Sequence, residues 1–366
     1  MCGMMKQAQY SKIILRFGQG MTGCVMLLSA AGLFDTYGRH LELLSHFRFQ
    51  YLLLALSGLI LLLGMKSWKW SVVALGCVIM NTLFIAPLYI RCHDDVARRL
   101  SIPVRLLYAN VNVANRHFSA LRDLIQIEQP DILILLEPDS QWLKALAPLK
   151  VSYQYQHSIS RSDGHGVMMY SHYPFSQIDI FYTHIGEFKL PTLLATLNLE
   201  HTKLTVLTTH PLPPMDDFRF WARNKQFCDL ISLIKQTTSP KLVCGDFNVT
   251  MWSSYYREFL SATGLINARQ GFGILPTWPT PHYYTIFARK FGVDGLRKRY
   301  AAGFNTVFSL PFARIPIDHC FVSSDIRIIH IRTGKDIGSD HLPLILDFAV
   351  ATGQGRFPIT QRGSES

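Results

Sequence analysis

Polar residues stand where several apolar segments of the chain end. These segments have the length and composition of buried β-strands. The residues at or beside their ends are Asn110, Glu137, His210, Asp246, Asn248, Asp318, Asp340 and His341. One such residue would most often form a turn, but so many at strand ends suggest shared chemistry. A hard divalent cation needs oxygen ligands, a phosphate needs N–H donors, and an attacking water needs a carboxylate that removes its proton.

The segment "VCGDFNVT" (243–250) places two polar side chains one residue apart at the end of an apolar run. Residues i and i+2 of a strand point the same way, so Asp246 and Asn248 are expected to project together. Gly245 has no Cβ and would let the backbone approach a ligand closely. The pair is therefore expected to act on one phosphate, with turn capping as the alternative.

Residues 104–350 alternate apolar strands with amphipathic helices. Strands are predicted at 104–111, 131–139, 166–171, 192–200, 203–211, 241–248, 317–324, 326–334 and 342–350. Helices are expected after the first, second, fifth and sixth of these strands. So many strands, joined partly by short turns and partly through helices, favour a two-sheet α/β sandwich over a single parallel sheet.

The first part of the chain reads as a membrane anchor. The runs 17–34, 49–65 and 70–90 contain no Asp, Glu, Lys or Arg, and each approaches the roughly 20 residues that span a bilayer. The mean hydropathy of the chain, +0.16, agrees with this interpretation. We therefore predict an anchor with three transmembrane helices over residues 1–91. Lysines and arginines are balanced on the two sides of the runs, so charge does not fix the orientation.

Composition narrows the remaining possibilities. Residues 92–103 read as a polar linker, and residues 351–366 read as a disordered tail. The net charge of +11 suits anionic lipid head groups as well as nucleic acid. Seven cysteines form no CxxC pair, which argues against a zinc site or a disulfide scaffold. No feature of the sequence calls for an obligate protein partner.

Taken in order, the strand-end motifs resemble a known family. They are "ANV" with Asn110, "LLEPD" with Glu137, "TTHP" with His210, "GDFNV" with Asp246 and Asn248, "IDHCFVSS" with Asp318, and "GSDHLPL" with Asp340 and His341. Over residues 104–350 the chain resembles the endonuclease/exonuclease/phosphatase superfamily with its deoxyribonuclease I-like fold, and the apolar runs resemble a membrane-anchored bacterial branch. The resemblance implies a four-layered α/β sandwich with two packed mixed sheets, one or two Mg²⁺ or Mn²⁺ ions, and hydrolysis of a phosphate ester.

The resemblance also implies a role for each strand-end residue. Glu137 would be the principal metal ligand, assisted by Asp340, and Asn110 would help to hold phosphate or water beside the metal. Asp246 would orient and activate the attacking water, while Asn248 would donate to a phosphate oxygen.

Two histidines complete the implied machinery. His341, held by Asp318, would stabilise charge in the transition state, and His210 would donate from the other side. In nucleases of the family a histidine of this second type is held by its own carboxylate. The segment "GHGVMMYS", which should supply that carboxylate, contains none, so His210 is expected to be positioned differently.

Three further residues are candidates for substrate binding. Arg219 and Arg223 lie on a predicted helix after His210 and could clamp a phosphate, with a solvated helix face as the alternative. Trp278, in "GFGILPTWP", could stack on a substrate or simply pack at the surface. The stretch 282–300 interleaves aromatic and basic residues, which suits nucleic acid, a lipid interface or a solvated insertion.

These features favour a multi-pass protein of a bacterial inner membrane, with an extracytoplasmic, metal-dependent phosphoesterase domain acting on a phospholipid or lipid-linked phosphate. A nuclease that acts on DNA and a catalytically idle membrane scaffold are the alternatives.

Overall fold

The chain is described by a computed structural model over residues 2–91, 101–200, 202–238, 240–283, 286, 306 and 310–351. The predicted linker (92–103), the predicted tail (351–366) and the basic aromatic stretch (282–300) lie mostly outside these residues.

Helices form the part of the structure before residue 92. They are α1 (Cys2–Ala31), α2 (Arg39–Ser45), α3 (Arg48–Gly64) and α4 (Trp68–Ile85), with short 3₁₀ helices η1 (Asp35–Tyr37) and η2 (Ala86–Tyr89). The segments Gln9–Ala31 and Trp68–Tyr89 are long and apolar enough to cross a membrane. A third segment qualifies if α2 and α3, which meet at a bend of 61°, are counted as one span.

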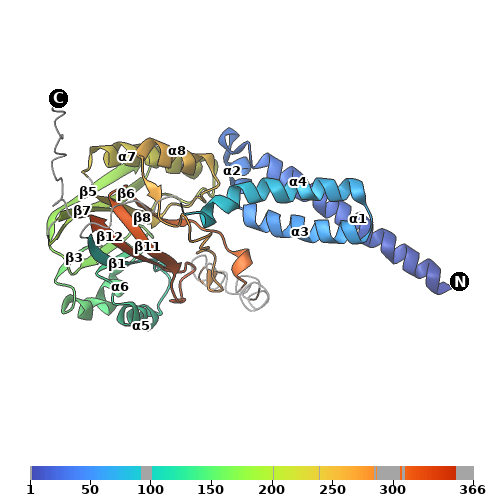
Figure 1. Cartoon of the computed structure of the whole chain (residues 1–366). Helices are drawn as coiled ribbons and strands as arrows, with labels where there is room; N and C mark the ends of the chain where they lie inside the picture. Colours follow the sequence, from blue (N-terminus) through green and yellow to red (C-terminus); the bar gives the residue numbers. More distant parts are fainter. Residues whose placement is uncertain are drawn as a thin grey trace, which may run out of the picture.

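Helices α1, α3 and α4 lie side by side as a bundle, and the N-terminus is at the end of this bundle farthest from the sheets (Figure 1). Val25, Ala55 and Cys77 pack together inside the bundle. On its outer surface large apolar side chains such as Leu27 and Leu83 are exposed. A continuous apolar exterior of this kind fits lipid contact.

Two six-stranded sheets form the rest of the structure. The first has the order β11 (Ile326–Thr333), β12 (Leu344–Ala351), β1 (Ser101–Asn110), β2 (Ile132–Leu136), β4 (Val167–Ser171) and β3 (Tyr155–Ile159). The second has the order β5 (Phe175–Ile185), β6 (Phe188–Leu199), β7 (Thr202–Thr209), β8 (Lys241–Asp246), β10 (Asp318–Val322) and β9 (Ile266–Asn267). Each sheet is mixed, because β1–β2 and β7–β8 are parallel while the other pairs are antiparallel.

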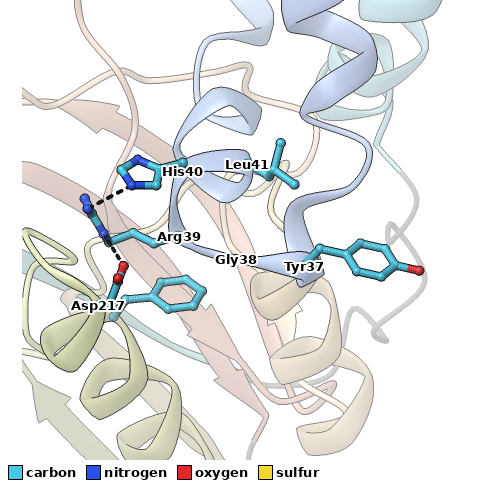
Figure 2. A pocket seen from close by; sticks show the side chains of 7 residues that line it. Tyr37, Gly38, Arg39, His40, Leu41 and Asp217 are labelled. Atoms are coloured by element: carbon cyan, nitrogen blue, oxygen red, sulfur yellow. Dashed lines mark hydrogen bonds and ion pairs between the residues drawn. The ribbon is translucent and has the colours of Figure 1, made fainter.

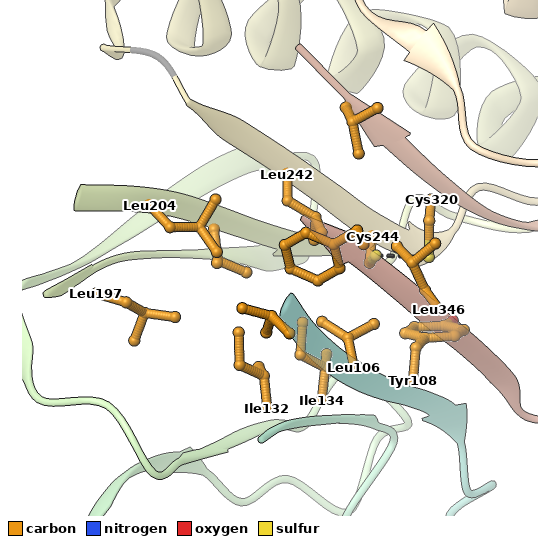
Figure 3. Packing of buried hydrophobic residues seen from close by; sticks show 14 of the residues in the cluster. Leu106, Tyr108, Ile132, Ile134, Leu197, Leu204, Leu242, Cys244, Cys320 and Leu346 are labelled. Atoms are coloured by element: carbon orange, nitrogen blue, oxygen red, sulfur yellow. Dashed lines mark hydrogen bonds between the residues drawn. The ribbon is translucent and has the colours of Figure 1, made fainter. Parts of the chain in front are cut away.

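Alternating side chains of the central strands build two kinds of core. In β1, Leu106 and Tyr108 point between the sheets, where Leu242 and Cys244 of β8 meet them (Figure 3). The next residue along, Leu107, points the other way, toward the helices that cover the first sheet. Because both faces are buried, these strands read as continuous apolar runs.

Helices complete the outer layers (Figure 1). The first sheet is covered by α5 (Phe118–Glu128) and α6 (Ser140–Ala145), and the second by α7 (Asp217–Gln236) and α8 (Ser254–Thr263). Two further 3₁₀ helices, η3 (Ala147–Lys150) and η4 (Pro311–Ala313), lie in connections. The predicted four-layered α/β sandwich of two mixed sheets, preceded by apolar helices, is confirmed.

The helical bundle packs directly on the sandwich. Ile85 and Leu88 share one apolar cluster with Val249, Met251 and Trp252, which follow β8. The backbone N–H groups of residues 271 and 273 donate to the carbonyl of Leu88 at 2.8 and 3.0 Å. The end of α4 therefore touches the loop that follows β8.

Candidate active site

Parallel strand pairs gather the predicted residues at one edge of the sandwich. Asn110 is the last residue of β1 and is paired with Leu136, so Glu137 follows at the same edge. In the second sheet Thr209 is paired with residue 245, which brings His210 beside Asp246. Asp318 lies directly opposite Asp246 across the antiparallel pair of β8 and β10.

Asn110 connects the two sheets at the centre of the site. Its Nδ2 donates to Oε1 of Glu137 at 3.0 Å and to Oδ2 of Asp246 at 3.3 Å. All three side chains are at least 91% buried, with exposed fractions of 1%, 9% and 2% for Asn110, Glu137 and Asp246. The amide separates two carboxylates that would otherwise repel each other in a poorly solvated environment.

The backbone at Glu137 adopts an uncommon conformation, with φ of +62°. Its N–H donates to the carbonyl of Gly166 at 2.9 Å, and its Oε2 accepts the N–H of Val113 at 3.3 Å. A Cβ at Gly166 would lie 2.1 Å from the carbonyl oxygen of Pro138, so only glycine allows this approach. This close backbone packing directs the carboxylate of Glu137 toward the site.

His210 is held by a backbone carbonyl in place of a carboxylate. Its Nδ1 donates to the carbonyl of Gly164 at 3.2 Å, which leaves Nε2 facing Oδ2 of Asp246 at 3.4 Å and Oε1 of Glu137 at 3.9 Å. Burial alone would lower the pKa of His210, but Asp246 and then Glu137 raise it above its usual value. A backbone carbonyl in the segment "SDGHG" thus supports His210, in place of the carboxylate side chain that "GHGVMMYS" does not contain.

Asp318 and His341 form a buried pair. Oδ2 of Asp318 accepts Nδ1–H of His341 at 2.8 Å, and Oδ1 accepts the hydroxyl of Tyr108 at 2.8 Å. Burial opposes the charge on His341, yet Asp318, Asp246 and Asp340 raise its pKa well above the usual value. The pKa of Asp318 is lowered by His341 in spite of burial. The pair therefore directs Nε2 of His341 into the site, 3.6 Å from Oδ2 of Asp246, with the protonated form of the ring favoured.

Asn248 departs from the geometry that the sequence predicted. Strand β8 ends at Asp246, and Asn248 has a φ of +50°, so the alternation of the strand does not continue to it. Its N–H donates to Oδ1 of Asp246 at 3.0 Å, while its Nδ2 donates to the carbonyl of Pro211 at 2.9 Å. Oδ1 of Asp246 thus caps a turn, which was the alternative role predicted for the pair, and Oδ2 faces the site.

Asp340 is held by a residue that the sequence analysis missed. Oδ1 of Asp340 accepts Nδ2–H of Asn112 at 2.8 Å, and the adjacent Ser339 donates through Oγ to the carbonyl of Asn110 at 2.7 Å. Asn112 has a φ of +57°, a conformation that asparagine adopts more readily than most residues. The only signal for Asn112 in the sequence was that it is the second asparagine of "ANVN".

The acidic side chains fit a divalent cation. Carboxylate oxygens are the ligands that Mg²⁺ and Mn²⁺ prefer, and Glu137, Asp246 and Asp340 are all buried here. Ligand atoms of Asp246, Asp318 and His341 also lie within 4.8 Å of one another. However, Asp318 already accepts from Tyr108 and His341 through both of its oxygens. Both oxygens of Glu137 also accept, from Asn110 and Val113, so hydrogen bonding does not separate the two groups of candidate ligands.

The three candidate substrate residues lie in different environments. Arg219, in the first turn of α7, is partly exposed, with its Nε 3.6 Å from Asp216. Trp278 is half-buried; its backbone bridges to Ile315, and the nearby Thr280 N–H donates to the carbonyl of Asp340 at 2.9 Å.

Arg223 is fully buried and cannot reach a phosphate at the surface. Its Nη2 donates to Oε1 of Glu42 in α2 at 2.8 Å, and its Nη1 donates to the carbonyl of Asn248 at 3.0 Å. The phosphate clamp proposed for Arg223 from the sequence is therefore corrected. A carboxylate 181 residues away in the chain occupies the guanidinium.

Comparisons with known proteins agree with this geometry. A profile described as "Endonuclease/Exonuclease/phosphatase family" matches residues 107–341. Similar solved structures include an endonuclease/exonuclease/phosphatase from Beutenbergia cavernae, with 16% identity and a TM-score of 0.51 over 69% of this chain and 72% of that chain. D. rerio TDP2 complexed with single strand DNA product has 16% identity and a TM-score of 0.51, over 67% and 98% of the two chains.

The human Nocturnin catalytic domain with bound sulfate anion has 17% identity and a TM-score of 0.50, over 71% of this chain and 100% of that chain. At such low identity these structures establish a shared fold. No curated protein sequence matched the chain.

Proposed function

The chain belongs to the endonuclease/exonuclease/phosphatase family, and we propose that it is a membrane-anchored, divalent-metal-dependent phosphoesterase that hydrolyses a phosphate ester carried by a lipid. The observation that carries the proposal is the position of the site. Asp246 is followed by a loop that packs on the ends of the apolar helices.

Glu137 and Asp340 are the proposed metal ligands, with Asn110 beside them. Asn110 and Asn112 orient these carboxylates through the bonds at 3.0 and 2.8 Å. When bound, Mg²⁺ or Mn²⁺ supplies positive charge against the oxygens of the phosphate.

Asp246 is the proposed base. Its Oδ1 is fixed by the N–H of Asn248, so its Oδ2, which faces the site, is the oxygen proposed to take a proton from the attacking water. Nδ2 of Asn110 and Nε2 of His210 lie 3.3 and 3.4 Å from that oxygen. These neighbours keep the carboxylate aimed at one point.

His341, His210 and Asn248 are proposed to stabilise charge on the phosphate. The cationic Nε2–H of His341 is directed by Asp318, and the raised pKa of His210 lets its Nε2 act as a donor. Asn248 retains one amide hydrogen beyond the bond to Pro211. Fixed donors in a buried site act strongly, because they need no reorganisation as charge develops.

An apolar surface beside the site supports a lipid substrate. Rings lead outward from His210, with centroids 5.7 Å apart from His210 to His165, 6.4 Å from His165 to Phe188 and 6.4 Å from Phe188 to Phe218. Phe218 and the adjacent Trp221 are 48% and 53% exposed. Exposed aromatic side chains next to a membrane anchor suit the acyl or prenyl part of a lipid. Arg219, between these rings, remains a predicted phosphate contact, and Trp278 a predicted substrate contact.

A substrate panel tests the function. The protein, solubilised in detergent with Mg²⁺ or Mn²⁺, is given phospholipids, lipid pyrophosphates, plasmid DNA and sugar phosphates in parallel. We expect chelator-sensitive turnover on a lipid. Turnover of DNA alone would favour the nuclease, with which the net charge of +11 is also compatible. Absence of metal-dependent turnover on every substrate would favour the idle scaffold.

The sandwich is proposed to lie outside the cytoplasm. With three spans, the larger count for these helices, the N-terminus and the sandwich would lie on opposite sides of the membrane, and the N-terminus lies at the end of the bundle away from the sheets (Figure 1). The resemblance to a membrane-anchored bacterial branch supports the extracytoplasmic side for the sandwich. Cys228 on α7 is exposed, so a membrane-impermeant thiol reagent is expected to label it in intact cells. A Cys228→Ser variant identifies the signal of this residue. Labelling of Cys228 only after lysis would contradict the proposed orientation.

A further inference from the structure

The guanidinium of Arg223 is enclosed at the junction between the helical bundle and the sandwich. It lies 5.2 Å from the ring centroid of Phe220 and 5.6 Å from those of Phe227 and Tyr255. Its exposed fraction is 0%, as is that of Glu42. Two opposite charges from distant parts of the chain are thus buried against each other, away from bulk water.

Glu42 also holds the loop that follows β8. Its Oε1 accepts both the Nη2–H of Arg223 and the hydroxyl of Ser253, the latter at 2.9 Å. Four residues along, His46 contacts Thr250 through Nδ1 and Oγ1 at 3.0 Å. Glu42 and His46, in and directly after α2, therefore hold loop 247–254 at two points.

Arg223 links this arrangement to the site. One arm of the guanidinium bonds to Glu42, and the other donates to the carbonyl of Asn248 at 3.0 Å. Asn248 is the residue whose left-handed backbone and N–H fix Oδ1 of Asp246. A displacement of Asn248 would therefore move both the amide and the carboxylate.

We propose that Glu42 and Arg223 are positioning residues for the reaction, so that the membrane anchor forms part of the catalytic apparatus. Glu42 fixes Arg223, Arg223 fixes the carbonyl of Asn248, and Asn248 fixes Asp246. The effect on turnover rests on the proposed function. The effect on the loop is independent of it and can be measured without a substrate.

A neutral pair separates positioning from stability. Removal of one member of a buried ion pair leaves the other charge unpaired, which is destabilising in itself. The double variant Glu42→Leu/Arg223→Met removes both charges and keeps the volume apolar, a change that often leaves stability intact. It nevertheless deprives the carbonyl of Asn248 of its donor.

A second ion pair at the same junction provides the control. Nε of Arg39 donates to Oδ1 of Asp217 at 2.9 Å, at a pocket lined by Tyr37, Arg39, His40, Leu41, Asp217 and Phe220 (Figure 2). This pair also joins the helical region to α7, but the side chain of Asp217 is 86% exposed, and within the described part of the chain it forms its hydrogen bond and ion pair with Arg39 and not with loop 247–254. Asp217→Asn therefore perturbs the junction alone.

The experiment compares the wild type, Glu42→Leu/Arg223→Met and Asp217→Asn as full-length proteins in detergent. Hydrogen exchange of the backbone amides in residues 247–254 is followed by mass spectrometry, together with the melting temperature. Turnover of bis(4-nitrophenyl) phosphate with Mn²⁺ is measured on the same samples. A small displacement of a catalytic group can lower kcat by about 10²-fold, and the same loss is expected in the double variant with KM unchanged.

The double variant is expected to exchange faster in residues 247–254 at a melting temperature near that of the wild type, while Asp217→Asn behaves as the wild type. Arg223→Lys should restore only part of the protection, because an ammonium lacks the fork that bonds both partners. Wild-type exchange in a folded double variant, or equally fast exchange in Asp217→Asn, would overturn the proposal. If the wild type hydrolyses nothing, the proposed function fails, and the exchange data still decide the positioning role.

Discussion

Replacement of Glu137 by alanine is expected to abolish turnover while the sandwich remains folded. The change removes a carboxylate from the proposed metal site, and loss of the cation's charge stabilisation is worth several kcal/mol, on the order of 10³-fold in rate. Added metal should restore little, because the remaining ligands lack the charge that held it. Turnover and the binding of Mn²⁺ by calorimetry are the measurements.

Glu137→Gln is the matched variant for this test. It keeps the shape of the side chain and an oxygen that can accept from Nδ2 of Asn110, and it gives up the bond from the N–H of Val113, so it removes the charge with a smaller loss of contacts than alanine does. Both variants should therefore lose activity, and the glutamine variant should melt closer to the wild type. A folded Glu137→Ala protein that retained most of its activity would remove Glu137 from the metal site.

Asp246→Asn is expected to lower kcat by about 10²- to 10⁴-fold with little effect on KM, since it removes a base and no binding contact. Asparagine keeps an oxygen that can accept the N–H of Asn248, so the turn after β8 should survive. Kinetics and thermal melting of the same preparation provide the comparison.

Asn248→Gly isolates the side chain of the neighbouring residue. Glycine accepts the φ of +50° at this position, whereas alanine would add backbone strain. Loss of the amide is expected to cost about 2.7 to 4 kcal/mol of transition-state stabilisation, as for other preorganised donors. If both variants lost stability but kept normal turnover, the pair would serve only to cap the turn.

The layered fold could be predicted because burial on two faces makes strands conspicuous. The interiors of β1, β2 and β8 are mainly apolar, and each overlaps a predicted strand, although β1 begins at Ser101, within the predicted linker. The strands β3, β5 and β9 were missed. All three lie at sheet edges; β3 and β5 are largely half-exposed, so their polar residues weaken the apolar signal, and β9 has only two residues.

The site could be predicted in part for a similar reason. Polar residues after buried strands mark an edge of a sheet, and parallel pairing brings those ends together. A hydrogen-bond partner that belongs to the backbone cannot be recognised from residue types in this way. The carbonyl of Gly164, which holds His210, is a group that every residue possesses.

Arg223 illustrates a further limit. Its helix carries charged and apolar residues in a weakly amphipathic pattern, so a solvated face and a phosphate contact were equally reasonable predictions. Its partner Glu42 stands between apolar runs of the predicted anchor, where a carboxylate reads as an ordinary interfacial residue. Only the three-dimensional arrangement brings the two charges together.

The order of segments along the chain gives this junction a meaning during biosynthesis. Residues 35–50 are translated long before Arg223 and Asn248, and domains generally fold in the order in which they emerge from the ribosome. Helix α2, which carries Glu42, and the following His46 are therefore already synthesised when loop 247–254 is translated, and the loop can pack against them. A newly made sandwich that has not yet packed on α2 would lack the contacts of Glu42 and His46 that order this loop. On the proposed positioning role, Asp246 would then be held in place only after the sandwich has packed on these helices.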